Sequence, residues 1–210
     1  MRFSQITSPS FVDGPGKRAV LFTVGCSHRC PGCQNAHLWD PAGGHDADAQ
    51  TLAALLAATD LPVTISGGEP FDQAADLATL LYHLRERAPF RHVILYTGYT
   101  FEELTRRMCR EPAILQALAL ADVLVDGPYI QEQDNDWMQY RGSANQRVID
   151  LQATLTKPAY EVWFNSGPVL LDWDIPEFII TDDGDLLGAS ALVESYGFDS
   201  CAARRCGETA

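Results

Sequence analysis

The chain has 210 residues, which is enough for one domain with a full hydrophobic core. Apolar residues make up 46% of it and charged residues 20%, as in ordinary globular proteins. Its 28 acidic residues outnumber 15 basic ones, giving a formal net charge of −13. This balance argues against nucleic acid or an anionic membrane surface as a partner, because both attract clustered Lys and Arg.

No feature of the sequence points to export or to insertion into a membrane. The first residues run directly into mixed sequence without a leader peptide, and no apolar run approaches the roughly 20 residues that span a bilayer. We therefore expect a cytoplasmic protein whose six cysteines are reduced thiols.

Apolar runs typical of strands alternate with helical patterns along most of the chain. Strands are predicted at 19–24, 62–66, 92–97 and 122–126, and helices at 47–58, at 74–87, from 100 onward and at 112–120. Thr100 and Glu103 form a capping box, because their side chains can satisfy exposed backbone amides. This alternation predicts an α/β fold with a parallel sheet, and right-handed crossovers make a partial (β/α) barrel the economical topology.

Three cysteines follow the first predicted strand with the spacing C-x3-C-x2-C. They are Cys26, Cys30 and Cys33, and no fourth cysteine lies nearby. Four thiolates close an iron–sulfur or zinc site, whereas three leave one metal position open to a substrate or cofactor. The alternative is half of a zinc ribbon, which only the distant Cys201 and Cys206 could complete.

Polar and glycine-rich motifs follow the other predicted strands. Gly67-Gly68-Glu69 comes after the second strand, Thr97-Gly98 after the third and Asp126-Gly127 after the fourth. The carboxyl ends of parallel strands meet at one edge of a sheet, where the ligand sites of α/β proteins gather. These motifs are therefore predicted to lie near the cysteines, although each also fits a plain turn that ends its strand.

The cysteine spacing resembles that of radical S-adenosylmethionine (SAM) enzymes. Six further motifs are similar, in order and spacing, to those of the activating enzymes of anaerobic ribonucleotide reductase. They are Asp13-Gly14-Pro15-Gly16, Gln34-Asn35, Ser66-Gly67-Gly68-Glu69-Pro70, Tyr96-Thr97-Gly98-Tyr99, Val125-Asp126-Gly127 and Arg141-Gly142-Ser143-Ala144-Asn145-Gln146. The resemblance covers roughly residues 1–150 and does not extend over residues 151–210.

The resemblance implies a radical SAM core domain at 1–150, built as a partial barrel of radical SAM type, and a small C-terminal extension at 151–210. Cys26, Cys30 and Cys33 are then the ligands of a [4Fe–4S] cluster whose fourth iron binds SAM. The residues implied to bind SAM are Gly32, Cys33, Gln34, Gly67, Gly68, Glu69, Thr97, Asp126 and Asn145. For Thr97 and Asp126 the alternative is that each only completes its strand, and for the segment that contains Asn145 it is a solvated loop.

The resemblance also implies the reaction and the partners. Reductive cleavage of SAM gives a 5′-deoxyadenosyl radical, which abstracts a Cα hydrogen from one glycine of a glycyl-radical protein. That partner is expected to be an anaerobic ribonucleoside-triphosphate reductase. The chain has no ferredoxin-like cysteine insert for additional clusters, so flavodoxin or ferredoxin is the expected electron donor.

Two other functions remain open from the sequence. A radical SAM enzyme that modifies a different peptide or small molecule is one, because the extension at 151–210 can carry substrate recognition. A zinc-binding structural module is the other. Within the extension we expect a hairpin at 178–187 and a short helix at 189–196, and the sequence assigns no role to Cys109, Cys201 or Cys206.

Overall fold

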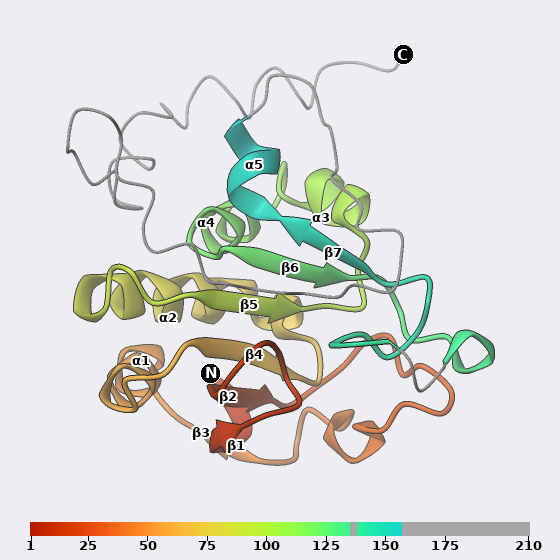
Figure 1. Ribbon diagram of the computed structural model, residues 1–210, viewed down its shortest axis with the longest axis horizontal. Helices are drawn as coiled ribbons and strands as arrows, with labels where there is room; N and C mark the ends of the chain where they lie inside the picture. The colour runs from red at the N-terminus through yellow and green to blue at the C-terminus, as the bar shows by residue number, and fades with distance from the viewer. Residues whose placement is uncertain (135–137, 157–210) are drawn as a thin grey trace.

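The computed structural model describes residues 1–134 and 138–156 of the chain (Figure 1). The predicted hairpin at 178–187 and the predicted helix at 189–196 lie outside the described residues, as do Cys201 and Cys206. The described part has one sheet with helices packed against it, so the predicted α/β class is confirmed.

Seven strands form a single mixed sheet. They are β1 (Arg2–Ser10), β2 (Arg18–Thr23), β3 (His45–Asp46), β4 (Val63–Gly67), β5 (Val93–Tyr96), β6 (Val123–Asp126) and β7 (Arg147–Asp150). Their order across the sheet is β3-β1-β2-β4-β5-β6-β7. The neighbours β2, β4, β5 and β6 are parallel, whereas the pairs β3-β1, β1-β2 and β6-β7 are antiparallel.

The four strands predicted at 19–24, 62–66, 92–97 and 122–126 are the parallel ones. The predicted parallel pairing is confirmed for these four strands, and antiparallel strands that were not part of the prediction extend the sheet on both sides. The strand β1 was not predicted because its nine residues mix polar and apolar side chains, and most of them stay partly exposed. Among the described residues no pairing joins β3 to β7, so these strands form an open row.

The first four α-helices of the described chain lie where the periodic patterns predict them, whereas α5 and the three 3-10 helices were not predicted. The helices are α1 (Ala49–Ala58), α2 (Ala74–Arg87), α3 (Phe101–Arg107), α4 (Pro112–Ala119) and α5 (Leu151–Thr156), with the short 3-10 helices η1 (Ala36–Leu38), η2 (Pro70–Gln73) and η3 (Gln131–Gln133). The predicted capping box of α3 is present, since Thr100 accepts from the Glu103 amide and the Glu103 carboxylate accepts from the Thr100 amide. None of the described helices is long and apolar enough to cross a membrane.

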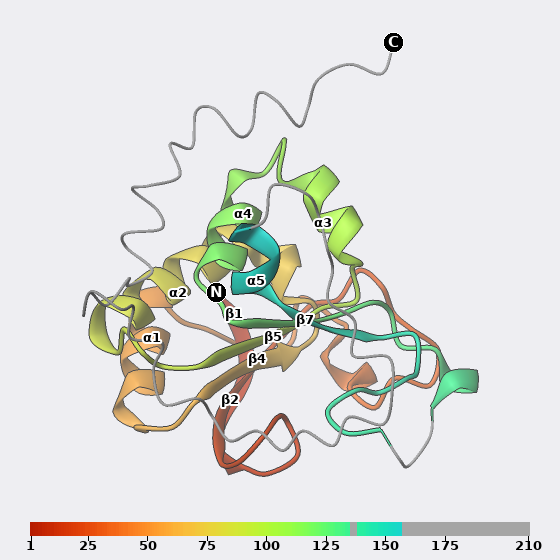
Figure 2. The same ribbon diagram turned by 45° about the horizontal axis from the view of Figure 1, so that its top comes forward.

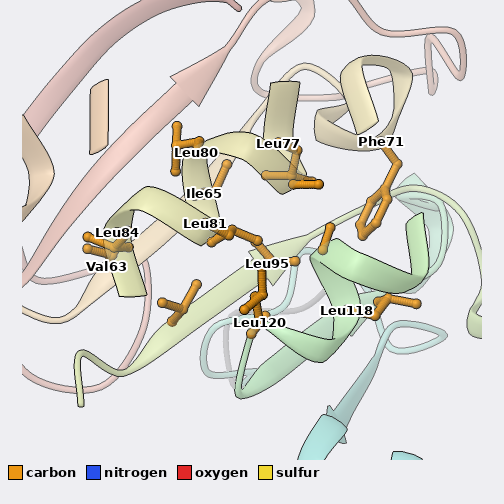
Figure 3. Close-up of a cluster of buried hydrophobic side chains, with 14 of the residues drawn as sticks. Val63, Ile65, Phe71, Leu77, Leu80, Leu81, Leu84, Leu95, Leu118 and Leu120 are labelled. Carbon is orange, nitrogen blue, oxygen red and sulfur yellow. The ribbon is translucent and has the colours of Figure 1, made fainter. Parts of the chain in front are cut away.

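The main hydrophobic core lies between the sheet and the helices α1, α2 and α4, which pack side by side over one face (Figure 2). Leu77, Leu81 and Leu84 of α2 face Ile65 of β4 and Leu95 of β5, and all five side chains are fully buried (Figure 3). Burying one leucine side chain stabilises a protein by about 1.5–3 kcal/mol. This layer therefore fixes the positions of the parallel strands, and with them the loops that leave the sheet.

The other face of the sheet carries a buried arginine. Arg18, at the start of β2, is only 2% exposed. Its Nε donates to Thr64 Oγ1 at 2.7 Å, and its guanidinium also donates to the carbonyl oxygens of Val63 and His92. Burial disfavours the charged form and lowers the pKa of Arg18 to about 10. The Thr64 hydroxyl donates to the Asp13 carbonyl oxygen, so the segment after β1 is held against this face.

Candidate functional site

A cavity of about 630 Å³ lies at the carboxyl ends of the parallel strands. In Figure 1 these strand ends point to the right. The cavity lining includes all three cysteines that follow β2, together with residues from the loops after β4, β5 and β6. The acidic side chains of the lining are Asp13, Glu69 and Asp134, and Arg141 is the one guanidinium that the described chain places there. The structure therefore brings the sequence motifs together around a single cavity.

The cysteines lie on an irregular loop, residues 25–35, which we call the cysteine loop. The Cys26 amide donates to the Trp39 carbonyl oxygen at 3.2 Å, which closes the loop at its base. Gly32 has a φ of +75°, a left-handed conformation that glycine adopts without a steric cost. The loop can thus turn tightly between its second and third cysteines.

Cys26, Cys30 and Cys33 are free thiols, and each is partly buried. Burial raises the pKa of Cys26 and of Cys30, because a thiolate is poorly solvated there. Backbone N–H groups act in the opposite direction, from Arg29 at Cys26 and from Tyr129 at Cys30. Metal ligation requires the thiolate, so iron binding would displace the protons of these thiols.

The donor set fits an iron–sulfur cube. Within the described residues, no three His, Cys, Asp or Glu side chains form a group that could hold one metal ion. In a cube each thiolate binds a different iron, so the three sulfurs need not converge on one point. No fourth cysteine is found on the part of the lining that the structure describes. Thiolates of the described chain can therefore hold three corners of a cube here.

The two glycines at the end of β4, Gly67 and Gly68, pack against the end of β2 and the start of the cysteine loop. A Cβ atom at Gly67 would collide with the backbone of Thr23, and one at Gly68 would collide with the backbone of Gly25. The Gly68 amide donates to the Thr23 carbonyl oxygen at 2.9 Å, and the Glu69 amide donates to the Gly25 carbonyl oxygen at 2.7 Å. Only residues without side chains allow the two turns to approach so closely.

The carboxylate of Glu69 is 1% exposed and joins three segments of the chain. Its Oε1 accepts hydrogen bonds from the Phe71 amide and from Thr97 Oγ1, both at 2.9 Å. Its Oε2 accepts from the Gly98 amide at 2.7 Å and lies 3.2 Å from the Nε2 of His28. The side chain that was expected to meet SAM thus contacts donors of the protein itself, which hold the β4 turn, the end of β5 and the cysteine loop together.

His28 connects the cysteine loop to that carboxylate. The Glu69 carboxylate beside it raises the pKa of His28. Nε2 makes no well-aligned hydrogen bond to the described chain, and its contact with Glu69 is an ion pair when the imidazole is protonated. The imidazole lies against Gly98, where a Cβ atom would collide with it, and it meets the Tyr99 ring edge-on with 4.3 Å between ring centroids.

A second set of contacts ties the cysteine loop to the same two strands. The Ser27 amide donates to Asp72 Oδ2 at 2.8 Å, and the Ser27 hydroxyl donates to Oδ1 at 3.0 Å. The Tyr99 hydroxyl donates to the same Oδ1 at 2.9 Å. The roles of Ser27, His28 and Asp72 were not predicted from the sequence, because nothing in their spacing signals contact, and Tyr99 was named only as part of a motif. The available signals were that Asp72 and Tyr99 each follow a predicted strand and that Tyr99 belongs to the motif Tyr96-Thr97-Gly98-Tyr99.

Seven of the residues expected to bind SAM line the cavity, namely Gly32, Cys33, Gln34, Gly67, Gly68, Glu69 and Thr97. Asp126 and Asn145 do not belong to this lining. The buried carboxylate of Asp126 accepts from the Phe101 amide at 2.7 Å and forms an ion pair with Arg147. The Asn145 amide group donates to the Pro128 carbonyl oxygen at 2.7 Å. Both side chains thus contact the protein itself.

Cys109 follows α3 and is not part of the cavity lining. It is disulfide-bonded, so the expectation of a reduced thiol is wrong at this position. The state of Cys201 and Cys206, outside the described residues, stays a prediction.

Comparison with known proteins agrees with this donor set. Residues 12–149 match the family model of a 4Fe-4S single cluster domain, so the chain belongs to that class of iron–sulfur proteins. Its relatives include the anaerobic ribonucleoside-triphosphate reductase-activating protein of Vibrio cholerae, 35% identical over 158 residues that cover 70% of this chain and 97% of the relative. The proteins of the same name from Escherichia coli K12 and phage T4 are each 32% identical, over 72% and 70% of this chain and 100% and 93% of the relative.

The chain therefore belongs to the family of anaerobic ribonucleoside-triphosphate reductase-activating proteins. The resemblance seen in the sequence is confirmed. Between 70% and 72% of this chain aligns with nearly the whole of each of these relatives, so the rest of it has no counterpart in them.

The contacts of Glu69 predict that its replacement by Gln, a change of nearly the same shape, lowers the free energy of unfolding. A Glu69→Gln variant replaces one carboxylate oxygen by an NH2 group. In one orientation of the side chain this group faces the Phe71 N–H, and in the other it faces the Gly98 N–H, so two donors oppose each other in both cases. Leaving a buried donor unsatisfied costs about 1–3 kcal/mol. We expect this loss in the free energy of unfolding of the cluster-free protein, measured with urea.

The matched control is Glu86→Gln, which neutralises an exposed carboxylate of α2 that pairs with His83. An exposed pair of this kind contributes little to stability, so the control should unfold like the parent protein. Equal stability of Glu69→Gln and the parent would contradict the role assigned to Glu69.

Proposed function

We propose that this protein activates an anaerobic ribonucleoside-triphosphate reductase by generating a radical on one glycine of that partner. The observation that carries the proposal is the single cavity that joins three free thiols to the glycine-rich turn after β4. Relatives named for this activity align along nearly their whole length with the chain. The partner and the target glycine follow from those names and are part of the proposal.

A bound [4Fe–4S] cluster and SAM would supply one-electron cleavage of the SAM sulfonium to a 5′-deoxyadenosyl radical, which takes the Cα hydrogen of the glycine. The residues of the chain would bind and orient these groups. Cys26, Cys30 and Cys33 would each hold one iron, with Gly32 and Gln34 beside them on the lining. The missing side chains of Gly67 and Gly68 would let the backbone approach SAM closely.

Arg141 would bind the carboxylate of SAM. Its Nη1 donates to the Gln146 carbonyl oxygen at 3.0 Å, which orients the guanidinium at the cavity. Its Nε is buried and makes no hydrogen bond to the described chain. An unsatisfied buried donor is costly, and a carboxylate that accepts from it would remove that cost.

The finer expectations from the sequence belong to the same proposal. The strands β2, β4, β5 and β6 would form part of a partial barrel of radical SAM type, which their parallel pairing and the position of the cavity support. Residues 1–150 would be the radical SAM core domain and 151–210 an extension. The protein would work in the cytoplasm. Flavodoxin or ferredoxin would be its electron donor, because the sequence has no motif for additional clusters that could pass electrons within the chain.

Anaerobic reconstitution with iron and sulfide, followed by dithionite and SAM, tests the proposal. We expect 5′-deoxyadenosine to form, and an anaerobic ribonucleoside-triphosphate reductase added to the mixture to acquire the EPR doublet of a glycyl radical. Replacing any one of Cys26, Cys30 or Cys33 by Ala should abolish both signals, because each would hold one iron. Cys201→Ala is the control and should still form the nucleoside.

Two negative results have different meanings in that experiment. Absence of 5′-deoxyadenosine from the reconstituted parent protein would overturn the enzyme activity itself. Nucleoside formation without a radical on the reductase would overturn only the partner, and would favour a radical SAM enzyme that acts on another peptide or small molecule.

The role of Arg141 predicts weaker binding of SAM when its charge is removed. A charge-assisted hydrogen bond contributes about 1.5–3 kcal/mol, which corresponds to about a tenfold or larger increase in Kd. We expect this increase for Arg141→Gln, measured by isothermal titration of the reconstituted protein. Arg110→Gln, a change at an exposed arginine, should leave the Kd unchanged. If both variants bind SAM like the parent, Arg141 is not a ligand of the carboxylate.

A further inference from the structure

The first of the three cysteines is held by backbone hydrogen bonds on both of its sides. The Cys26 amide donates to the Trp39 carbonyl oxygen at 3.2 Å, and the next amide along the chain, that of Ser27, donates to Asp72 Oδ2 at 2.8 Å. The Ser27 hydroxyl donates to the other oxygen of the same carboxylate at 3.0 Å. The backbone position of Cys26 therefore depends on where the Asp72 carboxylate lies.

Tyr99 contacts both that carboxylate and the loop that the carboxylate holds. Its hydroxyl donates to Asp72 Oδ1 at 2.9 Å and lies 3.1 Å from the Ser27 hydroxyl oxygen. Its ring meets the imidazole of His28, the residue after Ser27, edge-on. A displaced Tyr99 would thus free the carboxylate and the cysteine loop together.

Arg107, in the last turn of α3, packs on the Tyr99 ring. Its guanidinium carbon lies 4.3 Å from the ring centroid, within the range of a cation–π interaction. Its Nη2 donates to the Phe71 carbonyl oxygen at 3.2 Å and to the Glu111 carboxylate at 2.9 Å. Phe71 immediately precedes Asp72. Arg107 therefore contacts both the tyrosine that orients the carboxylate and the backbone that carries it.

The helix α3 fixes these two residues relative to each other. Tyr99 immediately precedes the capping box that begins α3, and Arg107 is the last residue of that helix. Side chains of a helix point towards its N-terminus, so the long Arg107 side chain extends back in the direction of Tyr99. Leu104, between them, is fully buried in the main core. The core thus anchors the helix independently of the cysteine loop.

We propose that Tyr99 and Arg107 are positioning residues that hold Asp72 against the cysteine loop, so that Cys26 is in place before iron binds. The inference rests on the proposed cluster site at the three cysteines. Removing a group that orients a metal ligand from outside the coordination sphere typically costs about 10–100-fold in metal affinity. A loop that is already ordered loses less conformational entropy on binding, so it holds the cluster more tightly.

Tyr99→Phe and Arg107→Gln test this role with two readouts. In the cluster-free protein, hydrogen exchange at the Ser27 amide, followed by NMR, should become faster in both variants, because the acceptor of this amide is no longer fixed. In the reconstituted protein, a chelator should remove iron about tenfold faster than from the parent, or more, because the loop that carries Cys26 opens more often.

Arg91→Gln is the matched control for the arginine. Arg91 also donates to one carbonyl oxygen, that of Leu61 at 3.1 Å, and to one carboxylate, that of Asp60 at 2.9 Å. These contacts lie before the strands β4 and β5 begin, whereas those of Arg107 lie beyond the ends of the same strands. The control therefore removes a similar set of bonds far from the cysteine loop.

Tyr82→Phe, a change at an exposed tyrosine of α2, is the control for Tyr99→Phe. Both controls should leave the Ser27 exchange and the iron release unchanged. Unchanged exchange or unchanged iron release in either test variant would overturn the inference. Equally fast iron release from Arg91→Gln would overturn it in favour of a general loss of stability.

Failure of this inference can be told apart from failure of the proposed function. The exchange measurement uses cluster-free protein, so its outcome does not depend on iron. A parent protein that takes up no iron during reconstitution would overturn the proposed function, and this inference with it.

Discussion

The buried carboxylate of Glu69 is the contact on which the arrangement of the site depends. The cysteine loop has almost no regular structure, so its shape must come from the elements around it. Glu69 supplies one part of that support through Gly98 and His28, and Asp72 supplies another through Ser27. Both acids follow β4, whose position is fixed by the leucine-rich core under α2. The rigid helix layer thus holds the irregular loop that carries the thiols.

Features that depend on local sequence could be predicted. The spacing of the three cysteines, the four parallel strands and the capping box of Thr100 and Glu103 each follow from neighbouring residues, and the structure contains all of them. The gathering of the motifs at one edge followed from strand direction alone, because parallel strands present their carboxyl ends together. Family resemblance added the cofactors and the reaction, which no periodic pattern could have shown.

Features that depend on contacts between distant segments could not be predicted. The strands β1 and β3, on the β3 side of the sheet, are weakly apolar, and their pairing is decided by the neighbours they find in the folded chain. Glu69 and Asn145 look alike in sequence, as polar residues in motifs near the site. Their hydrogen-bond partners lie 28 or 29 residues away for Glu69, at Thr97 and Gly98, and 17 residues away for Asn145, at Pro128. Only the folded structure shows that these groups are already satisfied by the protein.

The central proposal is that three cysteine thiolates of the chain each bind one iron of a [4Fe–4S] cluster and that SAM binds the fourth iron. Electron–nuclear double resonance on the reduced, reconstituted protein tests this directly, with SAM labelled by 15N in its amino group and by 17O in its carboxylate. The account predicts hyperfine coupling of both labels to the cluster. Uncoupled labels, together with coupling from a nitrogen of the protein, would show that the fourth iron already has a ligand from the chain and would contradict it.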